Sequence, residues 1–192
     1  MNLKINSEEW LQDEKAKSIS YFSIKKPVVV TQALINELKE ISKQNKNSNA
    51  RLCLHDSPGE SLHDMIILEW RDKKCRKPHK HLEKDETVQM IEGKMKVFTF
   101  SETGELIEEH LLEPKNNFIF RTKKGQYTIY LPLTEHAIYR ETKQGPFQQQ
   151  DNVFPSWSHI KVLEPLVEFD LTCYNSACRT PCALNTKLKK DR

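Results

Sequence analysis

The sequence predicts an all-β fold, an antiparallel sandwich or barrel with one short N-terminal helix. Between residues 50 and 142, short runs rich in β-branched and aromatic side chains recur, and turn-forming residues bound each run. A helical period of apolar residues is clear only once, ahead of these runs. Many short strands joined by close turns are typical of sandwiches and barrels rather than of parallel α/β sheets.

The helix is predicted over residues 32–46. Its apolar residues fall on one stripe of a 3.6-residue period. The members of this stripe are Leu34, Ile35, Leu38 and Ile41. Thr31 is a suitable N-cap, and the polar run 45–49 is a suitable end.

Nine strands are expected after the helix. Their predicted ranges are 51–55, 63–70, 75–81, 86–91, 94–100, 106–113, 117–121, 127–132 and 136–142. Two glycines mark tight turns between them, Gly93 after Glu92 and Gly104 in the hairpin that follows strand 94–100. Glycine suits such positions because it adopts positive φ without steric cost.

Three segments are expected along the chain. Residues 1–49 form an N-terminal strand and helix that pack on the barrel, with the valine run 27–30 as the strand. Residues 50–158 form the barrel itself. Residues 159–192 form a C-terminal extension, whose charged end is expected to fray.

The composition excludes several classes of protein. Lys and Arg number 30 against 27 Asp and Glu, and the two signs are interleaved, which argues against a nucleic-acid binder. No apolar run approaches the roughly 18 residues that a membrane-spanning helix needs. The first ten residues carry acids and have no apolar core of a secretory signal. We therefore expect a cytoplasmic protein with neither a membrane nor a nucleic-acid partner.

Five cysteines are present, and their odd number indicates mostly free thiols. They are Cys53, Cys75, Cys173, Cys178 and Cys182. The last three have the spacing C-x4-C-x3-C, which could serve a metal or redox cluster. They lack the C-x2-C pair typical of zinc ribbons, so a polar segment that happens to hold thiols is the preferred interpretation.

A candidate metal site centres on His79 and His81. Residues two apart in a strand project from the same face, and Glu86 is placed to begin the returning strand after a short turn. Imidazole nitrogens and a carboxylate oxygen together suit a borderline divalent transition metal. His136, at the start of a later strand, is the candidate for the fourth ligand. An H-x-H pair alone is more often a coincidence on the surface than a metal site. The assignment therefore depends on the longer pattern around the pair.

The segment from His79 to Gly93 reads H-x-H-x4-E-x6-G and resembles the first signature of the cupin superfamily. The second signature is similar to the segment from Gly125 to His136, although Leu131 and Leu133 stand where that family has Pro and Gly. The resemblance implies a jelly-roll barrel around one divalent transition metal, Fe, Mn, Ni or Zn. The ligands it implies are His79, His81, Glu86 and His136.

A narrower resemblance involves residues 51–55, which are similar to the R-x-N-L-H segment of WbuC-type cupin-fold metalloproteins, with Cys53 in place of Asn. Residues 145–147 and 154–157 are similar to the closing segments of that family. The match covers about residues 50–158. It implies a role linked to O-antigen or other surface-polysaccharide synthesis.

The face of strand 51–55 supplies a hypothesis about the substrate. Arg51, Cys53 and His55 share one face, while Leu52 and Leu54 share the other and are expected to pack on the helix or a second sheet. If the polar face looks into the barrel, Arg51 would bind a carboxylate or phosphate, and His55 would transfer protons as the candidate catalytic residue. The alternative is a polar strand face that points to solvent.

Two functional classes lead among those left open by the sequence, and a third, a structural metal barrel, would need a closed site without an exchangeable water. The first is a metal-dependent isomerase, epimerase or lyase-like enzyme acting on a small polar metabolite such as a nucleotide sugar or sugar acid. Fe(II) oxygenase chemistry fits the same ligands. The second is a non-catalytic, metal-anchored binding or sensor module for a small ligand. We also expect a homodimer formed through exposed strands, to which residues 20–30 could contribute.

Overall fold

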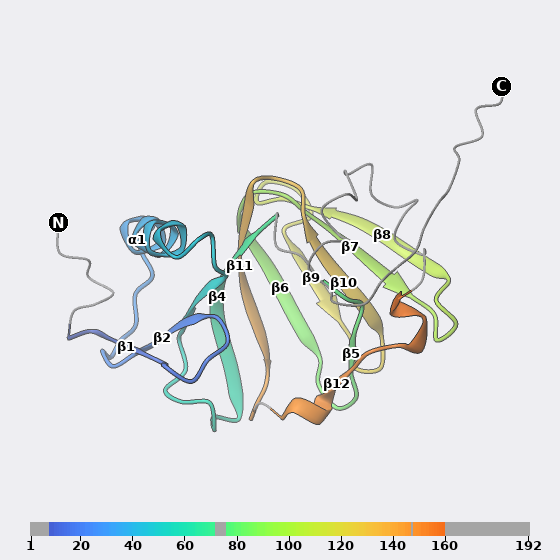
Figure 1. The fold of residues 1–192 in the computed structure, drawn as a ribbon, viewed down its shortest axis with the longest axis horizontal. Helices are drawn as coiled ribbons and strands as arrows, with labels where there is room; N and C mark the ends of the chain where they lie inside the picture. Colours follow the sequence, from blue (N-terminus) through green and yellow to red (C-terminus); the bar gives the residue numbers. More distant parts are fainter. Residues whose placement is uncertain (1–7, 72–75, 147, 160–192) are drawn as a thin grey trace.

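The computed structural model describes residues 8–71, 76–146 and 148–159 (Figure 1). Apart from one α-helix and two short 3-10 helices, the elements in this part of the chain are strands. The N-terminal elements are β1 (Trp10–Gln12), β2 (Ile19–Ser23), α1 (Gln32–Gln44), β3 (Ala50–Cys53) and β4 (Leu62–Trp70). The remaining strands are β5 (Lys80–His81), β6 (Glu86–Glu92), β7 (Met95–Phe100), β8 (Leu106–Leu112), β9 (Ile119–Thr122), β10 (Tyr127–Pro132), β11 (His136–Gln144) and β12 (Asn152–Val153). The 3-10 helices are η2 (Gln149–Asp151) and η3 (Ser156–His159).

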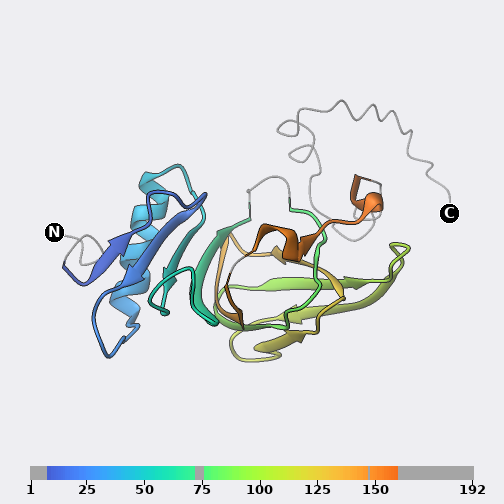
Figure 2. The ribbon, with the colours of Figure 1, turned by 90° about the horizontal axis from the view of Figure 1, so that it is seen from below.

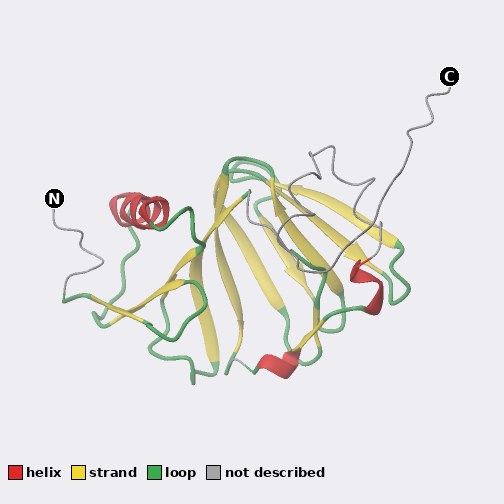
Figure 3. Cartoon of the chain, viewed as in Figure 1, coloured by secondary structure: helices red, strands yellow, loops and turns green. Residues whose placement is uncertain are grey.

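The predicted mostly-β fold with one short helix is confirmed, and each of the nine expected strands overlaps a strand of the structure. A seven-stranded sheet has the order β1-β2-β3-β4-β11-β6-β9, and a three-stranded sheet has the order β10-β7-β8. A short ladder joins β5 to β12. Figure 3 shows these strands together with the single α-helix at one side.

The expected closed barrel is not what the structure shows among the described residues. The three sheets are separate ladders, and a single bridge between His79 and Thr128 connects β5 to β10. The bridge does not extend because β5 is only two residues long. The fold is therefore a layered β-structure that is open between its sheets.

The helix α1 forms where its apolar stripe predicted it. The Thr31 hydroxyl accepts a hydrogen bond from the Leu34 amide at 3.2 Å, which caps the first turn. The helix ends at Gln44, two residues earlier than expected, because Lys46 and Asn47 take positive φ values of 57° and 53°. Left-handed backbone cannot continue a right-handed helix.

Two apolar cores lie along the long sheet. In the first core, α1 packs against β3, β4 and one face of β11 through Leu38, Leu52, Leu68 and Ile138, each buried to 0% exposure. In the second core, residues of β6 and β11 meet residues of β7 and β8, among them Val88, Met95, Val97, Leu112 and Tyr139. Figure 2 shows the helix beside the N-terminal strands, with the later strands forming the other half of the molecule.

The N-terminal strand was predicted at the wrong place. Residues 27–30 form no strand; Val28 and Val30 instead pack against the first core while Val29 is exposed. The strands lie earlier, and β2 pairs with β1 on one side and with β3 in parallel on the other. Residues 19–23 thus complete the sheet of their own chain. Val28 and Val30 therefore contribute apolar contacts to the core and form no strand pairing.

The two turn glycines behave as predicted, with φ values of +82° at Gly93 and +93° at Gly104. Gly93 connects β6 to β7, and Gly104 lies in the turn from β7 to β8. No helix in the described part of the chain is long and apolar enough to cross a membrane. The division at residues 49 and 158 stays a prediction. Cys75 and the cluster Cys173, Cys178 and Cys182 lie outside the described residues.

Candidate metal and ligand site

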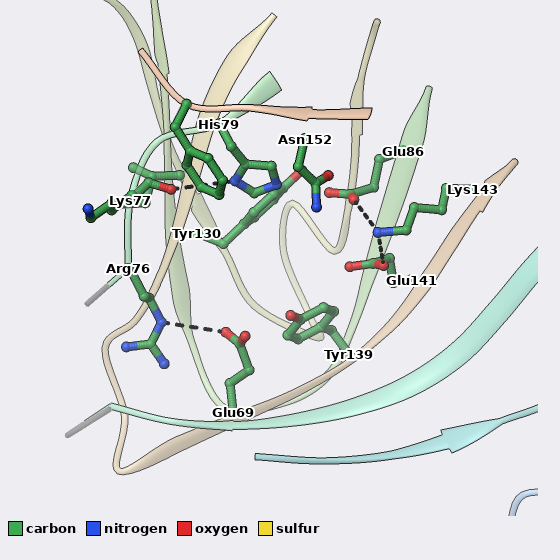
Figure 4. Close-up of a pocket in the computed structure, with 12 residues that line it drawn as sticks. Glu69, Arg76, Lys77, His79, Glu86, Tyr130, Tyr139, Glu141, Lys143 and Asn152 are labelled. Atoms are coloured by element: carbon green, nitrogen blue, oxygen red, sulfur yellow. Dashed lines mark hydrogen bonds and ion pairs between the residues drawn. The ribbon is translucent and has the colours of Figure 1, made fainter. Parts of the chain in front are cut away.

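A cavity of about 280 Å³ lies between the layers, where β4, β6, β10, β11 and β12 approach one another (Figure 4). Half of its twelve lining residues carry charged side chains. They are Glu69, Arg76, Lys77, Glu86, Glu141 and Lys143. Burying charge is costly unless it is paired, and here the three carboxylates are paired with Arg76 and Lys143.

One end of the cavity is built around the Glu86 carboxylate, which is 5% exposed. Its Oε2 atom lies 3.2 Å from Nε2 of His81 and 3.3 Å from Nζ of Lys143. The same ammonium lies 2.8 Å from Oε1 of Glu141. The sheet register explains this contact, since Lys143 of β11 pairs directly with Glu86 of β6, and Glu141 lies two positions away on the same face. A lysine thus bridges two buried carboxylates.

The pKa values of the two carboxyl groups are shifted in opposite directions. Burial raises the pKa of Glu86, but Lys143 and His81 outweigh it and lower the pKa to about 2. Burial raises the pKa of Glu141, and the charge of Glu86 raises it further, so that the net shift is upward despite Lys143. Burial lowers the pKa of Lys143, but the two carboxylates reverse this effect and raise it above its usual value. Lys143 and Glu86 are therefore ionised near neutral pH.

His79 and His81 face each other from the start of the β5 segment, with ring centroids 5.2 Å apart and nearly perpendicular planes. Burial lowers the pKa of His79, which favours the unprotonated ring that a metal requires. Nδ1 of His81 is buried with no hydrogen-bond partner. His81 thus lies beside both His79 and Glu86, and the role of these residues as metal ligands stays a prediction.

The other end of the cavity is formed by Glu69 and Arg76, whose Oε2 and Nε atoms are 3.6 Å apart. Burial raises the pKa of Glu69, against the influence of Arg76 and a hydrogen bond from Tyr139. Tyr130 shares a hydrogen bond of 2.8 Å with the hydroxyl of Thr122. Burial also raises the pKa of both tyrosines well above the usual range, so both remain protonated donors.

His136 is not brought to the other three predicted ligands, which corrects the expectation for the fourth ligand. Its Nε2 atom lies 2.8 Å from Oε1 of Glu92, and its ring packs against Trp70 at 5.3 Å. His136 begins β11, whereas the residue of β11 that pairs with Glu86 is Lys143, seven positions further on. At about 3.3 Å per residue, this separation places His136 at the far end of the strand.

Arg51 and His55 do not line the cavity either, which corrects their expected contact with a substrate there. Nε of Arg51 donates to the Ser20 hydroxyl at 2.6 Å, and His55 stacks on His63 with ring centroids 4.4 Å apart. The sheet order explains the displacement, since β4 separates β3 from β11 and the cavity-forming strands. The predicted packing of Leu52 and Leu54 on the helical side is observed.

Sequence reasoning missed the residues that surround Glu86 and the opposite end of the cavity. They are Glu69, Arg76, Tyr139, Glu141 and Lys143. Their only signal is the alternation along β11, which puts Tyr139, Glu141 and Lys143 on one face. That alternation becomes informative only when the pairing of β11 with β6 is known.

The donor set was compared with the needs of a divalent metal. Among residues 8–71, 76–146 and 148–159, no three His, Cys, Asp or Glu side chains stand ready as a coordination cluster. The donor types nevertheless fit, because His79 and Glu86 line the same cavity, His81 lies beside Glu86, and two imidazoles with an ionised carboxylate suit a divalent transition metal. His79, His81 and Glu86 are the residues that would hold a metal in this chain.

Comparison with known proteins gives a family model and a set of distant structural likenesses. Residues 30–112 match a model described as a domain of unknown function, DUF6016. No curated protein matches the chain. The narrower WbuC-type resemblance has no counterpart in these matches and stays a prediction.

Among solved structures, the chain is similar to the capsular polysaccharide assembling protein CapF from Staphylococcus aureus, with 14% identity and a TM-score of 0.46 over 56% of this chain and 29% of that one. It is similar to KdgF from Halomonas sp., with 16% identity and a TM-score of 0.41 over 53% and 82% of the two chains. It is also similar to L-ribose isomerase from Cellulomonas parahominis, with 14% identity and a TM-score of 0.43 over 58% and 70%. The chain therefore spans under a third of the CapF chain, and likenesses this distant carry no information about substrate or reaction.

Proposed function

We propose that this protein is a cupin-like, metal-binding enzyme that acts on a small polar metabolite in the cavity beside Glu86. The observation that carries the proposal is that His79 and Glu86 line one end of the cavity and that His81 lies beside Glu86. His81 makes a ring contact with His79 and lies beside Glu86, and these are the residue types that the sequence pattern proposes as ligands. A metal held there would act as a Lewis acid on a bound carbonyl or hydroxyl group.

The acid–base properties of the lining favour an enzyme over a passive site. Glu86 is held ionised while the pKa of Glu141 is raised, and pairs of groups with diverging pKa values are typical of sites that move protons. Isomerisation, epimerisation and elimination all require such proton transfers. Fe(II) oxygenase chemistry would use the same metal ligands.

The size of the cavity restricts which metabolites could bind in it. Pockets for drug-sized ligands range from about 300 to 1,000 Å³, so a volume of about 280 Å³ suits one sugar ring. A sugar acid therefore fits better than a nucleotide sugar, within the two classes that the sequence suggested. Arg76, at the end opposite Glu86, is the guanidinium best placed to approach the carboxylate of such a ligand.

The metal assignment is tested by measuring the metal content of the full chain purified without chelator. His79→Ala/His81→Ala should lose a bound divalent metal, since two of its three protein ligands disappear. His110→Ala, which removes a histidine paired with Glu108 on β8, is the matched control and should retain it. An unchanged metal content in the double variant would contradict the proposal.

A second experiment separates the enzyme from a non-catalytic binding or sensor module. Candidate sugar acids are incubated with the metal-loaded protein, and both binding heat and product are measured. Product formation supports the enzyme. Saturable binding without product supports the alternative function, a non-catalytic binding or sensor module that uses the same cavity.

The biological setting is proposed from the sequence alone. The similarity of residues 50–158 to WbuC-type proteins supports a place in surface-polysaccharide synthesis. A homodimeric state and a cytoplasmic location belong to the same proposal.

A further inference from the structure

We propose that Lys143 is an internal cation that competes with a divalent metal for Glu86 and thereby sets the metal affinity of the cavity. This inference rests on the metal site of the proposed function and adds a residue that the sequence pattern does not contain. The observation behind it is a shared oxygen atom. Oε2 of Glu86 is contacted both by His81, a proposed ligand, and by the ammonium of Lys143.

The distances show that Lys143 already contacts the Glu86 oxygen for which a metal would compete. Nε2 of His81 lies 3.2 Å from that oxygen, and Nζ of Lys143 lies 3.3 Å from it. Figure 4 shows the ammonium between the carboxylates of Glu86 and Glu141. The oxygen that would bind a metal is therefore already neutralised by a charge from the chain itself.

Burial makes this charge effective. The Lys143 side chain is 17% exposed and the Glu86 side chain 5%, so solvent screens their interaction weakly. The contact is also fixed by the sheet, because Lys143 and Glu86 are register partners of β11 and β6. A metal ion bound by Glu86 would meet a fixed positive charge within a few ångströms, and like charges at that range repel strongly.

Glu141 gives the ammonium a second partner. Its Oε1 atom lies 2.8 Å from Nζ of Lys143, whereas the Glu86 oxygen lies 3.3 Å from the same nitrogen. The lysine can therefore stay paired with Glu141 when Glu86 turns to a metal. Metal binding would exchange one partner of Lys143 rather than strand an uncompensated charge, which would be far more costly.

The test compares Co²⁺ binding by the full-length wild-type chain and Lys143→Met, which keeps the length of the side chain and removes its charge. Lys39→Met is the matched control, because Lys39 is also a shielded lysine, 19% exposed, paired with a glutamate of β6 outside the cavity. Titrations follow the visible absorption of Co²⁺, and thiolate charge-transfer bands would identify any binding by cysteines. We expect Lys143→Met to bind Co²⁺ about tenfold or more tightly than wild type, and Lys39→Met to match wild type.

Two further variants guard the interpretation. Glu141→Gln/Lys143→Met removes the second carboxylate as well, so that a folding defect from two unpaired carboxylates is avoided, and it should also bind more tightly than wild type. His79→Ala/His81→Ala/Lys143→Met should bind no Co²⁺. Equal or weaker binding by both folded lysine variants would overturn the role of Lys143 while leaving the metal site intact. An absence of Co²⁺ binding in wild type and in both variants would overturn the metal site itself.

Discussion

Individual residues of the same type behave differently in this protein because their neighbours differ. Glu86 and Glu141 are both buried carboxylates bound to Lys143, yet the pKa of Glu86 falls to about 2 while that of Glu141 rises. The difference arises because Lys143, His81 and His79 favour the ionised form of Glu86, whereas the charge of Glu86 opposes ionisation of Glu141. Chemical roles at this site therefore follow from contacts rather than from residue type.

Cys53 gives a residue-scale prediction. Its side chain is 2% exposed, and burial raises the pKa of the thiol to about 11. Because the thiolate is the reactive form, Cys53 should escape alkylation at pH 8 in the folded chain and react after denaturation. Peptide mass mapping distinguishes it from the other cysteines. Equal modification rates before and after denaturation would show that the thiol is accessible.

The same thiol contributes to the pH dependence of stability. The folded pKa lies above the ordinary value of 9.0, so the unfolded chain loses the proton first as pH rises. This contribution is complete below about pH 9 and is lost progressively between about pH 9 and 11. Cys53→Ala should remove this part of the alkaline loss of stability in urea denaturation at a series of pH values.

Gly93 and Gly125 form a matched pair for a second residue-scale prediction. Both have positive φ, +82° and +81°, but a Cβ at Gly93 would lie 2.5 Å from the His136 carbonyl oxygen, whereas nothing lies within 4 Å of one at Gly125. Gly125→Ala should cost about 1 kcal/mol of unfolding free energy for its backbone alone. Gly93→Ala should cost at least about 1 kcal/mol more. Equal losses in urea denaturation would contradict the close approach at Gly93.

At the scale of elements, β11 connects the two halves of the structure. It pairs with β4 on one side and β6 on the other. Ile138 belongs to the core under α1, while Tyr139, Glu141 and Lys143 line the cavity. The alternation of a single strand thus supports the helix with one face and builds the candidate site with the other.

Glu92 adds a polar contact to the apolar packing of α1 on this sheet. Its Oε1 atom lies 2.7 Å from Nζ of Lys39 on α1 and 2.8 Å from Nε2 of His136 on β11. Burial raises the pKa of Glu92, but the contacts with Lys39 and His136 outweigh it and give a net lowering. The ionised carboxylate therefore stabilises the folded state above its ordinary pKa of 4.5, and this stability is lost as pH falls through the lower folded pKa.

Glu92→Gln tests this element-scale contact. It should lower the unfolding free energy at pH 7 by about 1 kcal/mol or less, because the group is partly exposed. The difference from wild type should shrink as pH falls below 4.5, where the wild-type carboxylate becomes protonated. Glu83→Gln, in an exposed pair with Lys124, should change little at any pH. A difference for Glu92→Gln that stays constant from pH 7 to pH 3 would argue against the charged contact.

At the scale of the whole molecule, the long sheet serves two purposes along its length. The segment from β1 to β4 carries the helix, and the segment from β11 to β9 faces the second sheet and the cavity. The cavity is thus separated from the helix by the sheet. Changes on α1, such as Lys39→Met, should therefore leave the site undisturbed.

The oligomeric state is the prediction that belongs to the whole molecule. One chain has a mass of 22.6 kDa, and a homodimer should have twice that mass by sedimentation. In the structure, residues 19–23 pair within their own sheet, so such a dimer would use other strands. Among the described residues, the strands that end the two larger sheets are β1, β9, β10 and β8. Sedimentation velocity at several concentrations measures the mass directly, and a single species of one chain mass would contradict the homodimer.

The sequence by itself determined the local features of this protein. The helix stripe from Leu34 to Ile41, the positions of nine strands and the positive φ at Gly93 each depend on residues close together in the chain. The placement of His81 beside Glu86 belongs with them, because a single short turn joins the two strands that carry these residues.

Only the tertiary structure decided which distant residues complete the site. Lys143 reaches Glu86 across 57 positions of sequence, and His136, which a local pattern favoured as a ligand, instead binds Glu92 at the other end of β11. The physical reason is that strand pairing is a long-range choice. Alternation tells which residues of a strand share a face, but the register with its neighbours decides what that face meets.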